Sequence, residues 1–206
     1  MNHEDAPFEI HVHGDVKIRP EVGLEALQEA LRPLWQYAGA ATLADGAESL
    51  YEEEPGLRFD AINRLLQMCW TVRGAEDFRL QLDDLCMNLN DISAEGAPIE
   101  VTFYDASYDE EAEEAEDEDD LPDREARDDF VLLFVGPTPG AIMRVQRDVL
   151  VEDVMAVMAR HFEEGELGGV VAAIDQLFEG RRAALAHSLD MSRPQRGGRH
   201  APRRSH

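Results

Sequence analysis

Alternating apolar and polar positions mark the first strand that the sequence predicts. Residues 8–13 run Phe-Glu-Ile-His-Val-His, so apolar side chains face one way and polar side chains the other. This is the period of a strand with one buried face. The alternation recurs over 98–104, while 130–135 is a continuous apolar run, typical of a strand covered on both faces. A turn over 136–140 then predicts that 141–150 forms the hairpin partner of this strand.

Apolar residues at spacings of three and four predict the helices. The first helix spans 24–35, and Pro33 predicts a kink or two short helices meeting near Arg32. Apolar stripes over 59–70 and 78–92, joined by a short link, predict an antiparallel helical hairpin. The remaining predictions are a loop over 39–58 with a helical turn around 47–51, and helices over 152–161 and 167–178.

The order of these elements predicts an α+β fold: a single two-layer domain in which about four mostly antiparallel strands pack against helices. We expect this domain to cover residues 1–187. Residues 105–129 would form an acidic, disordered loop insertion inside it, because surface loops accept insertions at small entropic cost. Beyond His187 the chain has no apolar period and is rich in arginine, which predicts a disordered basic C-terminal tail over 188–206.

The net charge excludes several classes of partner. The 206 residues include 44 Asp and Glu against 19 Lys and Arg, a net charge of −25. Such a protein repels phosphate groups and anionic lipids, which argues against nucleic acid and membrane partners. The acidic first residues predict no secretory signal, and the presence of only two cysteines is consistent with a reducing compartment. We therefore expect a cytoplasmic location.

A run of acidic residues is the feature that most favours a binding function. The ten carboxylates are Asp109, Glu110, Glu111, Glu113, Glu114, Glu116, Asp117, Glu118, Asp119 and Asp120. The run lacks the ligand order and central glycine of an EF-hand, so we do not expect a tight calcium site. It could hold divalent cations loosely, mimic a phosphate backbone, or stay solvated. The interpretation we favour among the functional ones is a fast, salt-sensitive association with a basic protein partner. A second acidic cluster, at 52–54, is interpreted as a loop that faces water.

The HVHGD motif at residues 11–15 is the sharpest pattern for metal chemistry. Two histidines two positions apart on a strand share a face and can bind one metal ion. The motif resembles the first metal motif of amidohydrolase-like and PHP-type phosphoesterase families and the HxHxD of metallo-β-lactamase folds. The resemblance implies a small metal-dependent hydrolase with His11, His13 and Asp15 as ligands. The alternative interpretation is a set of solvent-facing strand residues opposite the apolar positions.

Other catalytic signatures are missing from the sequence. It has no CxxC pair, no glycine-rich phosphate loop and no GxSxG nucleophile motif. Cys69 and Cys86 fall on the two apolar helical stripes, where they would be buried, reduced and within reach of each other. The sequence therefore favours a soluble, non-enzymatic interaction protein without a cofactor, whose acidic surface engages a basic partner. The alternatives are the metal-dependent hydrolase and a nucleic-acid mimic.

Overall fold

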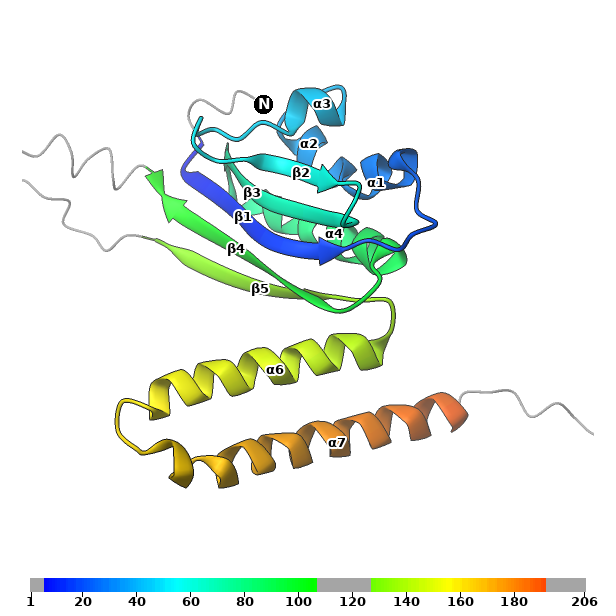
Figure 1. The fold of residues 1–206 in the computed structure, drawn as a ribbon. Coiled ribbons are helices and arrows are strands. Elements are labelled where there is room, and N and C mark those ends of the chain that lie inside the picture. Colours follow the sequence, from blue (N-terminus) through cyan, green and yellow to red (C-terminus); the bar gives the residue numbers. More distant parts are fainter. Residues whose placement is uncertain (1–5, 107–126, 192–206) are drawn as a thin grey trace, which may run out of the picture. The chain divides into compact units, whose positions relative to one another are not determined.

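The computed structural model describes residues 6–106 and 127–191 (Figure 1). The chain forms two compact units, an α+β unit up to Val149 and a helical unit from Leu150 onward. The acidic run at 109–120 and the tail from residue 192 lie outside the described residues. The single domain expected over 1–187 stays a prediction.

The α+β unit confirms the predicted fold class, with five strands in its sheet where about four were expected. The strand order is β2-β3-β1-β4-β5, and all neighbouring strands are antiparallel. The strands are β1 (Phe8–Lys17), β2 (Gly56–Asp60), β3 (Leu65–Gly74), β4 (Ala97–Asp105) and β5 (Asp129–Val135). Strands β1, β4 and β5 confirm three of the predicted strands, and β1 lies at the centre of the sheet.

Helices cover one face of this sheet (Figure 1). They are α1 (Leu24–Ala30), α2 (Arg32–Tyr37) and α4 (Arg79–Ile92), with the short η2 (Glu76–Phe78) leading into α4. The break between α1 and α2 at Leu31 confirms the two short helices expected near Pro33. Apolar side chains of β1 point to this face at every second position, and the largest buried side chains of the core are Trp70, Phe78 and Phe103. The side chains that β1 presents on the opposite face are therefore the polar ones.

The helix predicted over 59–70 is wrong, because these residues form the β2–β3 hairpin. Side chains of β3 point to the two faces of the sheet in turn, and those at every second position, Leu66, Met68 and Trp70, are buried in the core. The turn begins at Asp60, whose carboxylate accepts the backbone N–H groups of the residues two and three positions further on, at 2.9 and 3.0 Å. Ile62, in the middle of the range predicted as a helix, lies in this turn and is 93% exposed.

The strand predicted over 141–150 is also wrong, because α6 (Pro139–Met158) is one continuous helix that takes in most of the next predicted helix as well. Thr138 caps it: the Oγ1 atom accepts the N–H of Ala141 at 3.2 Å. Pro139 follows at the first helical position, where its missing N–H costs nothing. The Thr-Pro pair thus begins a helix and does not belong to a hairpin turn.

Two smaller expectations need correction. Strand β5 lies at the edge of the sheet, and Val135 is its only buried residue, so it is not covered on both faces. The helical turn in the loop after α2 is α3 (Leu43–Gly46), which precedes the expected position at 47–51.

The helical unit contains the last part of α6, the short η4 (Glu164–Glu166) and α7 (Gly168–Met191). Helix α7 extends past His187, where the disordered tail was expected to begin. Among the described side chains of this unit only Leu167 and Ile174 are buried. A search of the described helices finds none that is long and apolar enough to cross a membrane.

Candidate functional site

The HVHGD motif lies on the face of the sheet opposite the helices. His11, His13 and Asp15 alternate with buried residues along β1 and therefore share this face. The rings of His11 and His13 are stacked, with their centroids 6.1 Å apart. His13 and Asp15 are exposed, whereas the side chain of His11 is only 24% exposed. Of the three predicted metal ligands, His11 is thus the one held inside a structured environment.

His11 belongs to a cluster that includes residues from two other segments. Its Nδ1 atom lies 2.9 Å from Thr71 Oγ1 and 3.2 Å from Glu54 Oε1. The hydroxyl of Thr71 also donates to Glu54 Oε1, at 3.0 Å. Thr71 is opposite His11 in the β1–β3 register, and Glu54 lies just before β2. The three polar groups therefore meet over the centre of the sheet.

The segment that carries Glu54 is fastened to β3 by several hydrogen bonds. The Leu50 N–H donates to the Thr71 carbonyl at 2.9 Å, and the Trp70 indole donates to the Glu48 carbonyl at 3.0 Å. Ser49 donates its hydroxyl to Glu54 Oε2 and accepts the Thr71 N–H at 2.8 Å. These bonds fix the carboxylate in place, with only 17% of the side chain exposed.

Gly56 lets the segment pass close to its own beginning. The residue has φ +72°, and a Cβ atom there would lie 2.0 Å from the carbonyl oxygen of Ala47. Only glycine adopts this conformation without strain and leaves this space free. The interpretation of residues 52–54 as a loop that faces water is therefore wrong for Glu54, although Glu52 and Glu53 are exposed.

Cys69 completes the cluster. One ligand atom from each of His11, Glu54 and Cys69 can be chosen so that all three lie within 4.8 Å of one another. Burial raises the pKa of the Cys69 thiol, and the negative charge of Glu54 raises it further, so the group is a neutral thiol near pH 7. Cys69 is on strand β3 and points to the face of the sheet opposite the helices, whereas Cys86 is on α4. The prediction that the two cysteines are within reach of each other is therefore wrong.

Glu54 and Cys69 are the members of this cluster that sequence reasoning missed. Among the described residues, His13 and Asp15 do not join the group of closely spaced ligand atoms. The signal that could have found Cys69 is the pairing of β1 with β3, which places it opposite His13 and two residues from Thr71. No local pattern indicates Glu54, because its position depends on the path of a loop.

The acidic residues predicted to bind a partner, 109–120, lie outside the described residues, but the residues on either side of their segment are described. Asp105 at the end of β4 accepts hydrogen bonds from the backbone N–H and the Nε of Arg127, at 3.1 and 3.0 Å. Asp128 accepts the N–H of Asp105 at 2.9 Å. The segment therefore leaves and re-enters the sheet at neighbouring positions of β4 and β5.

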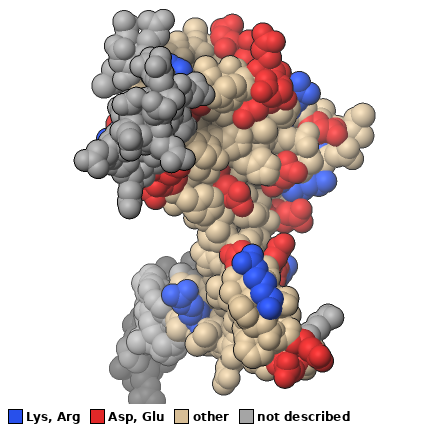
Figure 2. Space-filling view, turned by 90° about the vertical axis from the view of Figure 1, so that its left-hand side faces the viewer, with Lys and Arg blue, Asp and Glu red and all other residues tan. Residues whose placement is uncertain are grey.

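The rest of the α+β unit is acidic as well. Its described residues include 22 Asp and Glu against 10 Lys and Arg, a net charge of −12. Figure 2 shows acidic side chains spread over this unit with fewer Lys and Arg among them. Such a surface attracts cations and basic proteins.

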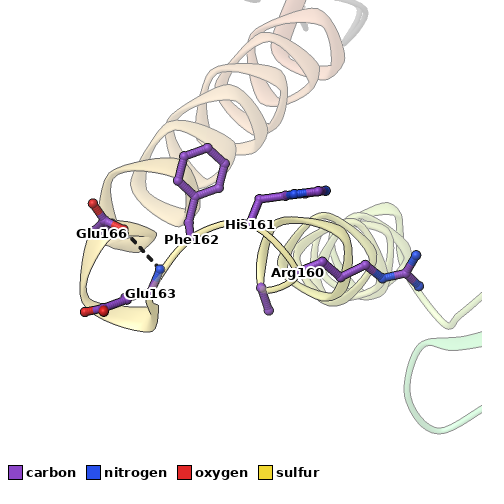
Figure 3. Close-up of a pocket in the computed structure, with 6 residues that line it drawn as sticks. Arg160, His161, Phe162, Glu163 and Glu166 are labelled. Carbon is purple, nitrogen blue, oxygen red and sulfur yellow. Dashed lines mark hydrogen bonds between the residues drawn. The ribbon is translucent and has the colours of Figure 1, made fainter.

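A hollow lies in the turn between α6 and α7, with a volume of about 650 Å³ (Figure 3). Its lining includes Arg160, His161, Phe162, Glu163 and Glu166. The Glu163 N–H donates to the Glu166 carboxylate at 3.0 Å, and this bond closes the turn. The His161 and Arg160 side chains point away from the two glutamates in Figure 3, so the polar groups do not converge on a common point.

Comparison with protein families shows the family to which the chain belongs. A family model matches residues 8–179, from the start of β1 into α7. The chain belongs to the family of unknown function DUF6806. The DUF6806 match extends well beyond the sheet, so the family includes α6 and the first half of α7 as well as the α+β unit. Searches of curated proteins and of solved structures gave no match.

Proposed function

We propose that this DUF6806 protein is a non-enzymatic binding protein that engages a basic protein partner. Two properties of the described residues support the proposal: the apolar surface of α6 and α7, and the acidic surface of the α+β unit. The first would supply contact area, and the second would select and attract the partner.

The observation that carries the proposal is the exposure of the apolar side chains of α6. Twelve of its 20 residues are Ala, Val, Ile, Leu or Met, yet none of them is buried. A helix that is apolar on most of its faces normally lies inside a protein. Exposed apolar surface of this kind marks a site of protein contact. Leu177 of α7, which is 70% exposed, adds to the apolar surface.

Charge favours a basic partner over an acidic or neutral one. The net charge of −12 on the described α+β unit adds to that of the ten carboxylates at 109–120. Opposite charge on a partner accelerates association and suppresses binding of other acidic proteins. The association should therefore weaken as salt screens the charges.

A pair of matched variants tests the proposal. Leu177→Glu places a charge on α7, and Leu80→Glu places the same charge on α4, where the leucine is 71% exposed. The partner is first captured from native lysate on the full-length protein and identified, and its binding is then measured with both purified proteins. We expect Leu177→Glu to weaken binding by about tenfold, while Leu80→Glu has little effect.

Three results would contradict the proposal. These are equal effects of the two variants, an affinity that does not change between low and high salt, and a captured partner that is acidic. A variant lacking residues 109–120 should associate more slowly, because it has lost ten negative charges. If the partner is a DNA-binding protein that free DNA displaces, the protein acts as a nucleic-acid mimic.

A further inference from the structure

The polar face of the sheet brings together three kinds of metal ligand. His11 offers a nitrogen, Glu54 an oxygen and Cys69 a sulfur, and atoms of the three lie within 4.8 Å of one another. Zinc binds this combination, because it accepts imidazole, carboxylate and thiolate ligands with metal–ligand distances of about 2.0–2.3 Å. Ligand atoms around a tetrahedral zinc ion are about 3.5 Å apart, so small side-chain rotations would close the site.

We propose that His11, Glu54 and Cys69 form a binding site for zinc, with water in the fourth position. The site uses residues of β1, β3 and the loop before β2, whereas the apolar surface that carries the proposed function is on α6 and α7; neither proposal depends on the other. Sulfur and nitrogen ligands select zinc over magnesium and calcium, which take oxygen ligands.

The surroundings of the three ligands are organised in the manner of a metal site. Thr71 and Ser49 both donate hydroxyl hydrogens to the carboxylate of Glu54. Hydrogen bonds of this kind orient a ligand and sharpen its position. His11 and Cys69 stand on adjacent central strands of the sheet, so their backbones are firmly held.

The electrostatic surroundings favour a cation. Among the described residues, the ion pair of Glu54 is with His11, a side chain that is neutral when it binds a metal. Glu48, Glu52 and Glu53 lie in the same segment as Glu54, whereas the nearby Glu9 is paired with Arg73 at 3.6 Å. A divalent ion at the cluster would be attracted by several carboxylates.

His13 provides a test of the ligand set. It is opposite Cys69 in the β1–β3 register and stacks on His11, but it is exposed and outside the cluster. The HVHGD motif predicts His11, His13 and Asp15 as the ligands, whereas the geometry points to His11, Glu54 and Cys69. Substitutions at positions 13 and 69 therefore distinguish the two sets.

The experiment uses the full-length protein without a His tag, titrated with zinc against a chromogenic chelator and with cobalt as a spectroscopic probe. We expect one ion per chain and a near-ultraviolet thiolate-to-cobalt band. Cys69→Ser should abolish the band, and His11→Gln or Glu54→Gln should weaken zinc binding by about 100-fold or more, since loss of even an outer partner costs 10–100-fold. His13→Gln, Asp15→Asn and Cys86→Ser should bind as the wild type does.

The opposite pattern would overturn the site. It fails if cobalt gives no thiolate band, if Cys86→Ser abolishes the band, or if His13→Gln and Asp15→Asn weaken zinc binding while Cys69→Ser does not. Alkylation of the wild-type protein tests the site without any variant: zinc should protect Cys69 and leave the labelling of Cys86 unchanged. Equal labelling of Cys69 with and without zinc would also reject the proposal. None of these results bears on binding of a basic partner, which has its own test.

Discussion

The two units of the chain use their apolar residues in opposite ways. In the α+β unit, 23 hydrophobic residues form one buried cluster that joins the sheet to α1, α2 and α4. In the helical unit, only Leu167 and Ile174 are buried among the described side chains. Both units have apolar residues at regular spacing, so the difference lies in what covers them.

This difference indicates where the folding free energy resides. Each buried aliphatic or aromatic side chain contributes about 1.5–3 kcal/mol relative to an exposed one, so the α+β unit has the larger share. Two buried residues supply little to the helical unit, and its helices should open at low energetic cost. Apolar residues that add little to folding remain available for contact with another protein.

Substitution of a large apolar residue in each unit should show the contrast most strongly. Trp70 is fully buried, and Trp70→Ala should lower the free energy of unfolding by about 3–5 kcal/mol. Leu177 is 70% exposed, and Leu177→Ala should change it by less than about 0.5 kcal/mol. Urea unfolding followed by far-ultraviolet circular dichroism measures both. A large loss for Leu177→Ala would mean that the chain itself covers α7.

The hydrophobic pattern was sufficient to predict an element where the apolar positions of that element alone have the period of a strand or of a helix. Strands β1 and β4 alternate over their whole length, and the 14-residue helix α4 places its buried leucines and Ile92 on a single face. The β2–β3 hairpin defeated the same reasoning, because Phe59 on one strand and Leu66 on the other fall by coincidence at a helical spacing across the turn. Local spacing cannot distinguish one helix from two strands that pair.

The candidate site was accessible to sequence reasoning only in part. His11 was identified because its motif is local. Cys69 required the register of β1 and β3, and Glu54 required the path of a loop fixed by Gly56. These are contacts between distant parts of the chain, which spacing along the sequence does not encode.

Substitutions of glycine by alanine in the two units should change the free energy of unfolding by less than Trp70→Ala does. Gly56→Ala places a Cβ atom 2.0 Å from the Ala47 carbonyl at φ +72°, so it should cost about 2–3 kcal/mol. Gly39 has φ +75° but nothing within 4 Å, so Gly39→Ala should cost only the conformational strain, about 1 kcal/mol. Gly180 lies in α7 with open space around it, and Gly180→Ala should stabilise that helix by up to about 1 kcal/mol.

Thermal unfolding of the three variants tests this order. If Gly56→Ala is no worse than Gly39→Ala, the close approach to Ala47 does not exist and the loop that carries Glu54 is free to move. If Gly180→Ala destabilises the protein, α7 is packed more tightly at that position than its surroundings indicate.

The smallest effect should appear at alkaline pH. All four tyrosines lie before residue 109, so their ionisation reports on the first part of the chain and not on the helical unit. Burial is the main cause that raises the pKa of Tyr37 to about 12, and the hydrogen bond to Glu9 is the main cause that raises the pKa of Tyr51 to about 12. Both should remain neutral well above pH 10, the usual pKa of tyrosine.

The sign of the effect on stability follows from this shift. In the unfolded chain these two phenols lose their protons near pH 10, whereas in the folded chain they keep them until about pH 12. The folded state therefore binds more protons between pH 10 and 12, and stability falls as the pH rises through this window. Phenolate absorbance should show two late-titrating groups, and Tyr37→Phe and Tyr51→Phe should each remove one. Because the helical unit contributes no tyrosine, a loss of helix signal below the pH at which these phenols ionise would show that α6 and α7 melt before the sheet does.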